Sequence, residues 1–178
     1  MTTLETLLND PDLAGGWKII PDRSAVTFKI RNMWGLLTVK GRFTEFTGDG
    51  QLTGQGSVFG RLDIRTASVQ TGIGRRDEHL RSADFFDVER FPEISVVVTA
   101  IHPTEGKGAD LRASFTIKGI SAPVPLPVTV TGSGDGSIQI SGETRIDRSQ
   151  FGIGWNKFGM VAPAAKAAAQ AVFVRSGR

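Results

Sequence analysis

The residues most able to do chemistry lie between Gly74 and Phe91 (GRRDEHLRSADFFDVERF). This segment holds His79, whose imidazole is suited to acid/base work or to metal binding. The nearest acidic residues are Asp77, Glu78, Asp84 and Asp87. Mixed nitrogen and oxygen ligands occur in zinc and manganese sites, but no standard ligand spacing is present. We prefer a hydrogen-bonded structural loop to a polar contact at a ligand pocket, and either of these to a metal site.

The same segment combines Arg75, Arg76 and Arg81 with apolar Leu80, Phe85 and Phe86. One interpretation is a solvated face of mixed charge with an apolar underside. The other is a lid over a cavity mouth. In the second, Phe85 and Phe86 would cover the mouth, and Arg76 or His79 would donate hydrogen bonds to the polar end of a ligand.

Recognised catalytic and cofactor motifs are missing from the rest of the sequence. There is no G-x-S-x-G, P-loop or H-E-x-x-H pattern, and Gly72-Ile73-Gly74 lacks the third glycine of a dinucleotide fingerprint. Cysteine is absent, which excludes disulfides and thiol catalysis, and the absence of tyrosine removes a common acid/base residue. We therefore expect no cofactor, no bound metal and no enzymatic activity.

Composition narrows the class of partner. The 178 residues are 39% hydrophobic and 22% charged, with a net charge of +3 and the cations spread along the chain. Without a basic stripe in the sequence, no nucleic-acid partner is expected. No run approaches the roughly 20 apolar residues of a membrane-spanning helix. Residues 1–16 lack the apolar run of a signal peptide, so the sequence as written predicts a cytoplasmic protein.

From Trp17 onward, apolar residues recur at every second position, which is typical of half-buried strands. About eight such runs follow one another, separated by glycine-rich hairpin loops that we place at Thr47–Gly50, Glu105–Asp110 and Gly132–Ser137. Two helical segments are expected besides. One is short and amphipathic, over about residues 3 to 9, with a frayed tail as its equal alternative; the other covers about residues 75–90. We divide the chain into an N-terminal helix or tail, 1–16, and one domain, 17–178.

These elements predict an all-β fold, an extended eight-stranded antiparallel barrel. Eight strands enclose an interior that is either filled by side chains or holds one small ligand, and long strands make it a tube. Pro123, Pro125 and Pro127 recur at period two and cannot donate to a neighbouring strand on that side. We expect a gap in the barrel along residues 122–128.

The apolar face of each strand is expected to look into the tube. The residues assigned to its lining are Val26, Phe28, Ile30, Leu62, Ile64, Val96, Val98, Phe115 and Ile117.

The sequence resembles the YceI-like family over roughly residues 17 to 175. The likeness is carried by the run from Ser68 to Gly72 (SVQTG), the run from Arg76 to Val88 (RDEHLRSADFFDV) and Phe91-Pro92. Further matches are Trp17, Gly41-Arg42-Phe43, Ile117-Lys118-Gly119 and Arg148-x-x-Phe151-Gly152-Ile153.

This resemblance implies a lipocalin-like barrel that holds a polyisoprenoid or an isoprenoid quinone. It therefore predicts non-catalytic binding, storage or transport of such a lipid, with the lipid as the partner and a homodimer allowed. Two alternatives stay open: an enzyme of lipid or stress metabolism with His79 as acid/base, and an interaction module with a solid core. Many members of this family are periplasmic or secreted, so the resemblance and the missing signal peptide predict different locations.

Overall fold

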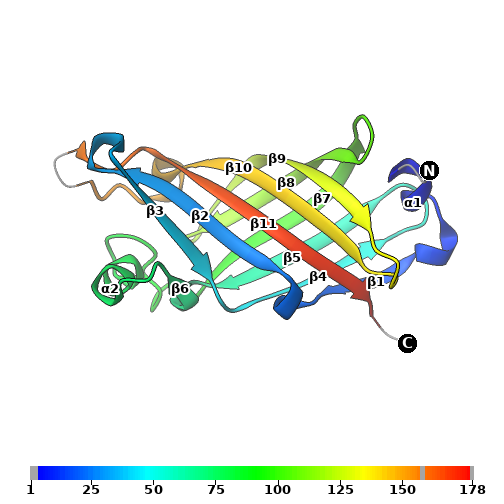
Figure 1. The fold of residues 1–178 in the computed structure, drawn as a ribbon, viewed down its shortest axis with the longest axis horizontal. Helices are drawn as coiled ribbons and strands as arrows, with labels where there is room; N and C mark the ends of the chain where they lie inside the picture. Colours follow the sequence, from blue (N-terminus) through cyan, green and yellow to red (C-terminus); the bar gives the residue numbers. More distant parts are fainter. Residues whose placement is uncertain (1–3, 157–158, 177–178) are drawn as a thin grey trace.

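Eight antiparallel strands close into a barrel in the computed structural model, which describes residues 4–156 and 159–176 (Figure 1). In ring order they are β1 (Gly15–Ile19), β4 (Phe46–Leu52), β5 (Val58–Arg65), β7 (Glu93–Pro103), β8 (Gly108–Ile117), β9 (Ile120–Gly132), β10 (Ile138–Asp147) and β11 (Ala164–Arg175). The ring closes where Trp17 of β1 pairs with Arg175 of β11. The predicted all-β antiparallel barrel is confirmed.

Three further strands extend the sheet beyond β11. They are β2 (Ala25–Asn32), β3 (Leu37–Phe43) and β6 (Val69–Gln70). β11 is long enough to pair first with β2, through residues 165–170, and then with β1, through residues 173–175. The extended wall therefore carries the barrel toward the end at which α2 lies (Figure 1).

Both predicted helices are present, at opposite ends of the barrel (Figure 1). α1 spans Leu4–Leu8, with Leu4 and Leu8 buried; residue 3 of the predicted helix lies outside the described residues. α2 spans Gly74–Arg81, and turns continue the segment to Arg90. The helix ends where the Ser82 hydroxyl donates to the His79 carbonyl at 2.6 Å. The shorter 3-10 turns are η1 (Pro11–Leu13), η2 (Pro21–Arg23), η3 (Met33–Gly35), η4 (Thr66–Ser68) and η5 (Arg148–Phe151). None of the described helices is long and apolar enough to cross a membrane.

The hairpin loop predicted at Thr47–Gly50 is wrong, because these residues lie within β4. The turn lies instead between β4 and β5, where Thr53 and Ser57 are joined by a backbone hydrogen bond of 3.1 Å. Glycine and aspartate here are strand residues: Asp49 is exposed, whereas Gly48 packs against Ile19. The glycine-rich composition that suggested a turn therefore belongs to a strand, β4, whose inner face has little room for side chains.

The gap predicted from the three prolines is confirmed. β9 pairs with β8 from Ile120 to Thr129, but with β10 only from Val128 onward. The open length thus ends one residue earlier than predicted, because Val128 pairs with Gly142. Across the gap, the Thr144 hydroxyl donates to the Pro125 carbonyl at 2.7 Å.

An aromatic cluster inside the barrel depends on one glycine. Phe28 of β2 is opposite Gly41 of β3, and its ring covers the position that a Gly41 side chain would take. There the Phe28 ring lies 5.6 Å from the Phe43 ring, which lies 5.7 Å from the Phe86 ring of the segment after α2. The absence of a side chain at Gly41 therefore lets Phe28 join the cluster through which β2 and β3 contact Phe86.

Replacing Gly41 by alanine is expected to lower the free energy of unfolding by about 1–3 kcal/mol, as overpacking of a core does. The new Cβ would lie 2.2 Å from Cζ of Phe28, so the ring would have to leave its place. Urea unfolding measures the change. Gly132→Ala is the matched control, since its Cβ would meet no atom within 4 Å. Equal losses of stability in the two variants would contradict this account.

Candidate ligand-binding site

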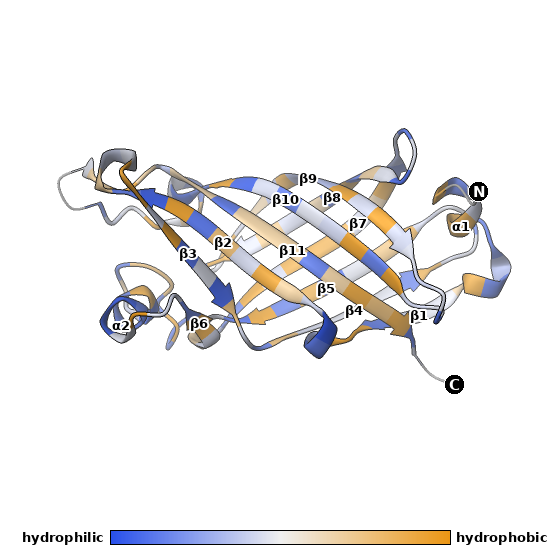
Figure 2. Cartoon of the chain, in the orientation of Figure 1, coloured by the Kyte–Doolittle hydropathy of each residue, from blue (hydrophilic) through white to orange (hydrophobic). Residues whose placement is uncertain are grey.

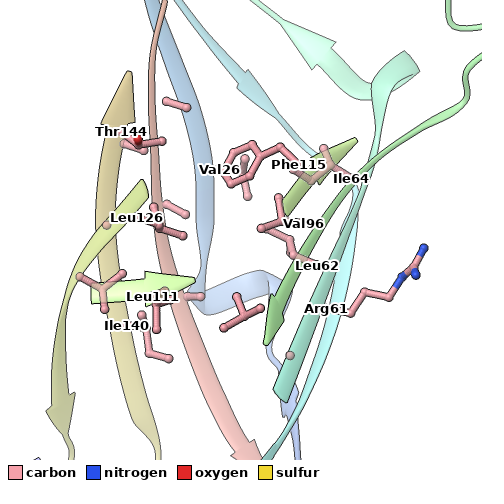
Figure 3. Close-up of a pocket in the computed structure, with 18 of the residues that line it drawn as sticks. Val26, Arg61, Leu62, Ile64, Val96, Leu111, Phe115, Leu126, Ile140 and Thr144 are labelled. Carbon is pink, nitrogen blue, oxygen red and sulfur yellow. The ribbon is translucent and has the colours of Figure 1, made fainter. Parts of the chain in front are cut away.

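An apolar cavity of about 320 Å³ runs along the inside of the barrel. Leu4 and Leu8 of α1 line it at one end, and Leu80, Phe85 and Phe86 line it at the other. Figure 3 shows Val26, Leu62, Val96 and Phe115 facing Leu111, Leu126 and Ile140 across a shared space. The barrel therefore encloses an elongated, almost wholly apolar space.

Small residues on the inner face keep this space open. β11 contributes four alanines to the lining at every second position, Ala165, Ala167, Ala169 and Ala171. Gly142 of β10 pairs with Ala169, and elsewhere on the wall Gly50 of β4 pairs with Gly60 of β5. An eight-stranded barrel with large residues at these positions would fill its interior. In this barrel the inward-facing residues of β11 are alanines, which leave part of the interior unfilled.

The residues that the sequence assigned to the tube all lie on the wall of this cavity. They are Val26, Phe28, Ile30, Leu62, Ile64, Val96, Val98, Phe115 and Ile117. Phe85 and Phe86, the two aromatic residues that the lid interpretation places over the mouth, line it as well. This places their side chains; that they contact a ligand stays a prediction.

The end of α2 and the turns that follow it close one end of the cavity with apolar side chains. Leu80, Phe85 and Phe86 pack against the core cluster of the barrel. Arg81 fastens the segment to the strand wall, because its guanidinium donates to the carbonyls of Ala67 and Val69 at 3.0 and 3.1 Å. Apolar side chains thus cover this end of the cavity, and the hydrogen bonds of Arg81 hold them against the strands.

Arg76 belongs to a second polar brace and does not line the cavity. Its guanidinium donates to Oγ1 and to the carbonyl of Thr71, at 2.8 and 2.9 Å. Asp77 is buried and accepts hydrogen bonds from the backbone N–H and the hydroxyl of Thr71. These bonds tie the start of α2 to the strand before it.

His79 also lies off the cavity wall. Its Nε2 is 2.8 Å from Oδ2 of Asp84, and its ring makes edge contacts with Phe85 and Trp155, at centroid distances of 5.1 and 4.5 Å. Across the described residues, no group of three or more potential metal ligands gathers around it or elsewhere. The head-group contact expected of Arg76 and His79 remains a prediction, since the structure gives both residues partners within their own end of the barrel.

Arg148 of η5 is a buried cation on the cavity wall, and reasoning from the sequence did not select it. Its buried guanidinium donates to four backbone carbonyls, those of Ala162, Ile153, Trp155 and Val161, at 2.9–3.4 Å. Burial lowers the pKa of Arg148, against the opposing charge of Asp147. The available signal was the Arg148-x-x-Phe151-Gly152-Ile153 motif, which pointed to a family and not to a role. Arg148 provides a fixed positive charge at the α2 end of the cavity.

Three other polar residues of the wall, Thr144, Thr27 and Arg61, have partners or point away from the space. Thr144 and Thr27 donate to the carbonyls of Pro125 and Ala168, at 2.7 and 3.5 Å. Arg61 points away from the cavity (Figure 3) and lies 2.9 Å from Asp63, holding the pKa of that carboxyl below its usual range. The wall therefore offers few polar groups to a polar solute, whereas its apolar side chains are suited to contact with an apolar chain.

Solved structures with the same fold include proteins from three bacteria. BcnA of Burkholderia cenocepacia superposes with a TM-score of 0.80 at 23% identity, over 88% of this chain and 99% of BcnA. A polyisoprenoid-binding domain of Saccharophagus degradans, implicated in plant cell wall breakdown, has a TM-score of 0.74 at 14% identity, covering 90% and 98%. The YceI protein of Campylobacter jejuni has a TM-score of 0.69 at 21% identity, covering 80% and 88%. At these identities the likeness shows the fold alone.

Sequence comparison identifies the family. A UPF0312 protein of Pseudomonas putida strain W619 is 34% identical over 101 residues, 56% of this chain and 52% of that protein. A UPF0312 protein of Shewanella sp. strain ANA-3 is 28% identical over 103 residues, covering 57% and 53%. The matched region thus spans about half the length of these curated relatives. The YceI-like domain model matches residues 17–173, nearly the whole barrel, and the chain therefore belongs to the YceI-like family.

Proposed function

We propose that this barrel binds a long-chain apolar lipid, a polyisoprenoid or an isoprenoid quinone, and stores or transports it without chemical change. The observation that carries the proposal is the apolar lining, which continues from Leu4 of α1 to Phe86 beyond α2. A globular or strongly polar ligand would match neither the shape nor the lining of this space.

Burial of the chain would supply most of the affinity. Each Å² of apolar surface removed from water contributes roughly 25 cal/mol, and the walls of the cavity consist almost entirely of such surface. A linear chain could use that surface along the whole barrel. The similarity to the polyisoprenoid-binding domain of Saccharophagus degradans supports an isoprenoid over other apolar chains.

We place the polar end of the lipid at the α2 end of the barrel. Arg148 lies on the cavity wall there, with four hydrogen bonds to backbone carbonyls, so it would act on a phosphate or carbonyl oxygen mainly through its positive charge, which is screened less than an exposed charge. At the opposite end, α1 presents Leu4, Leu7 and Leu8 to the cavity, which suits the apolar tail.

The two alternatives find less support. An enzyme that uses His79 would need this residue at the ligand, whereas its imidazole pairs with Asp84 and does not line the cavity. A solid-core interaction module would have no cavity of this size. The binding protein is therefore the function that the geometry favours.

Organic extraction of the purified protein, followed by mass spectrometry, is expected to release a stoichiometric long-chain lipid. The hydrophobic wall should retain such a chain through purification in aqueous buffer. Extraction of protein unfolded in denaturant and then washed provides the blank. A protein that yields no lipid, and that binds none of a set of added polyisoprenoid phosphates and quinones, would overturn the proposal.

A narrower cavity is expected to retain less lipid, or to select a lipid with a shorter chain. Ala169→Leu adds a larger side chain beside Gly142 on the inner wall, where it would occupy lipid space. We expect less lipid, or lipid of shorter chain length, in protein that still unfolds cooperatively. Val128 and Leu126 already lie against Gly142, so crowding is expected to lower the free energy of unfolding as well, by up to about 1–3 kcal/mol. Gln170→Leu, on the exposed face of the same strand, is the matched control. Loss of stability by about 1–3 kcal/mol with unchanged lipid would indicate a filled core.

Arg76→Ala distinguishes a brace from a head-group contact. Because Arg76 bonds to Thr71, we expect a lower melting temperature and equal losses of a polyisoprenoid phosphate and of the plain hydrocarbon of equal length. His79→Ala should behave in the same way through loss of the Asp84 pair. Preferential loss of the phosphate-bearing lipid in either variant would instead assign that residue to the head group.

A further inference from the structure

The turn between β2 and β3 exposes apolar side chains to solvent. Seven large apolar side chains are exposed among the described residues, and four of them lie in this turn: Met33, Trp34, Leu36 and Leu37, at 36%, 67%, 82% and 58%. We call residues 33–37 the apolar tip. Contiguous exposed apolar residues of this kind mark interaction surfaces on proteins.

The backbone holds the apolar tip in a defined shape. Met33 and Trp34 have φ angles of 51° and 55°, in the left-handed region where glycine or asparagine is usual. The Trp34 N–H donates to the Met160 carbonyl at 3.2 Å, and the Met33 N–H donates to the Asn32 side chain at 2.8 Å. The turn thus keeps large apolar residues at strained positions while its backbone groups are bonded, which presents the side chains outward.

A row of cations lies on the outer face of the barrel behind the tip. Lys40 of β3 pairs with Lys29 of β2, Lys29 with Lys166 of β11, and Lys166 with Arg145 of β10. All four residues are exposed. Like charges directly opposite each other on neighbouring strands are destabilising, so this row weakens the fold in the absence of a partner.

Few acidic groups offset this row. Within the described part of the chain, Lys166 alone of the four forms an ion pair, with Glu143 at 3.0 Å. Asp147, farther along β10, interacts electrostatically with Arg145 of the row and accepts hydrogen bonds from the backbone and side chain of Ser149. Arg31 and Arg42 are exposed on the same outer face of β2 and β3, and the alternation of hydrophilic and hydrophobic bands along β2 is visible in Figure 2. The face is therefore positive.

We infer that the apolar tip and the cationic row together form a docking site for the surface of a bilayer that contains anionic lipids. From Met33 back along β2, Arg31 is roughly 7 Å and Lys29 roughly 13 Å away, at about 3.3 Å per residue. When Trp34 and Leu36 enter the boundary between head groups and acyl chains, these cations lie at the level of the phosphates. Trp is a residue favoured at that boundary, and apolar insertion with basic flanks is the usual pattern of interfacial binding.

The location of the docking site suits exchange of the ligand, a point that rests on the proposed function. Ile30 and Ala165 pair with each other just behind the tip, and both line the cavity. Docking would bring this end of the cavity to the membrane, where an apolar chain could pass between bilayer and barrel without crossing water.

The test is sedimentation with vesicles of phosphatidylcholine alone and of phosphatidylcholine with an equal amount of phosphatidylglycerol. The parent protein is expected to bind the anionic vesicles at low salt, more weakly at high salt, with a blue shift of tryptophan fluorescence. Trp34→Ser with Leu36→Ser should lose both the binding and the shift. Lys29→Gln with Lys40→Gln should weaken binding to the anionic vesicles by about tenfold or more, since each basic residue near the surface contributes to the attraction.

Controls separate docking from folding and from ligand binding. Lys18→Gln with Lys107→Gln removes the same charge far from the tip, and Ile73→Ser removes an exposed apolar residue outside it; both should bind vesicles like the parent. Lipid content by mass spectrometry should be unchanged in the tip and row variants, so failure of docking is distinct from failure of the proposed function. The inference is overturned if the parent binds neither vesicle, if the tip variant binds like the parent, or if the tip mediates self-association or RNA binding in place of vesicle binding.

Discussion

The hollow interior of this protein depends on the small side chains that β11 directs inward. Eight strands enclose only enough space for ordinary side chains, so a barrel of this size is hollow only where residues on its inner wall are small. Ala165, Ala167, Ala169 and Ala171 meet that condition along one strand. The same absence of packing makes the empty barrel less stable than a filled one, since unfilled space forfeits van der Waals contacts. An apolar ligand would restore those contacts.

The wall combines this open bore with a local break in the sheet. The prolines of β9 remove the donors that β10 would need, and the hydroxyl of Thr144 supplies one of the missing bonds to the Pro125 carbonyl. Closure of the ring is nevertheless retained, because β9 pairs with β10 from Val128 onward and β1 pairs with β11. A barrel can therefore tolerate an unpaired length where side chains cover the backbone, as long as the strands are fastened elsewhere.

The two ends of the barrel are closed by different means. At one end, α1 inserts leucines into the cavity. At the other, α2 and the turns after it cover the cavity with apolar and aromatic residues, and Arg76 and Arg81 of α2 donate to backbone carbonyls of the chain before the helix. Arg148 likewise donates to carbonyls of the chain between η5 and β11. Charged residues at this end thus serve mainly to hold loops in place. This explains why a segment rich in ionisable groups, which by composition resembles a catalytic site, lies beside an apolar cavity.

The sequence alone determined which residues alternate and where a ladder must break. Period-two runs identified most strands and their inward faces, including Phe115 and Ile117, and three prolines located the gap, because both features are local properties of the chain. Local patterns failed at β4, where glycines on an inner face resembled a turn. They also could not show that Arg148 lies on the cavity wall, that Arg76 and His79 are occupied by other partners, or that Lys29, Lys40, Arg145 and Lys166 form one row. The row depends on the register between neighbouring strands, which is set only when the sheet forms. The partners of Arg76 and His79 lie only five residues away, but which side chains meet there depends on how α2 and the turns beside it fold against the barrel.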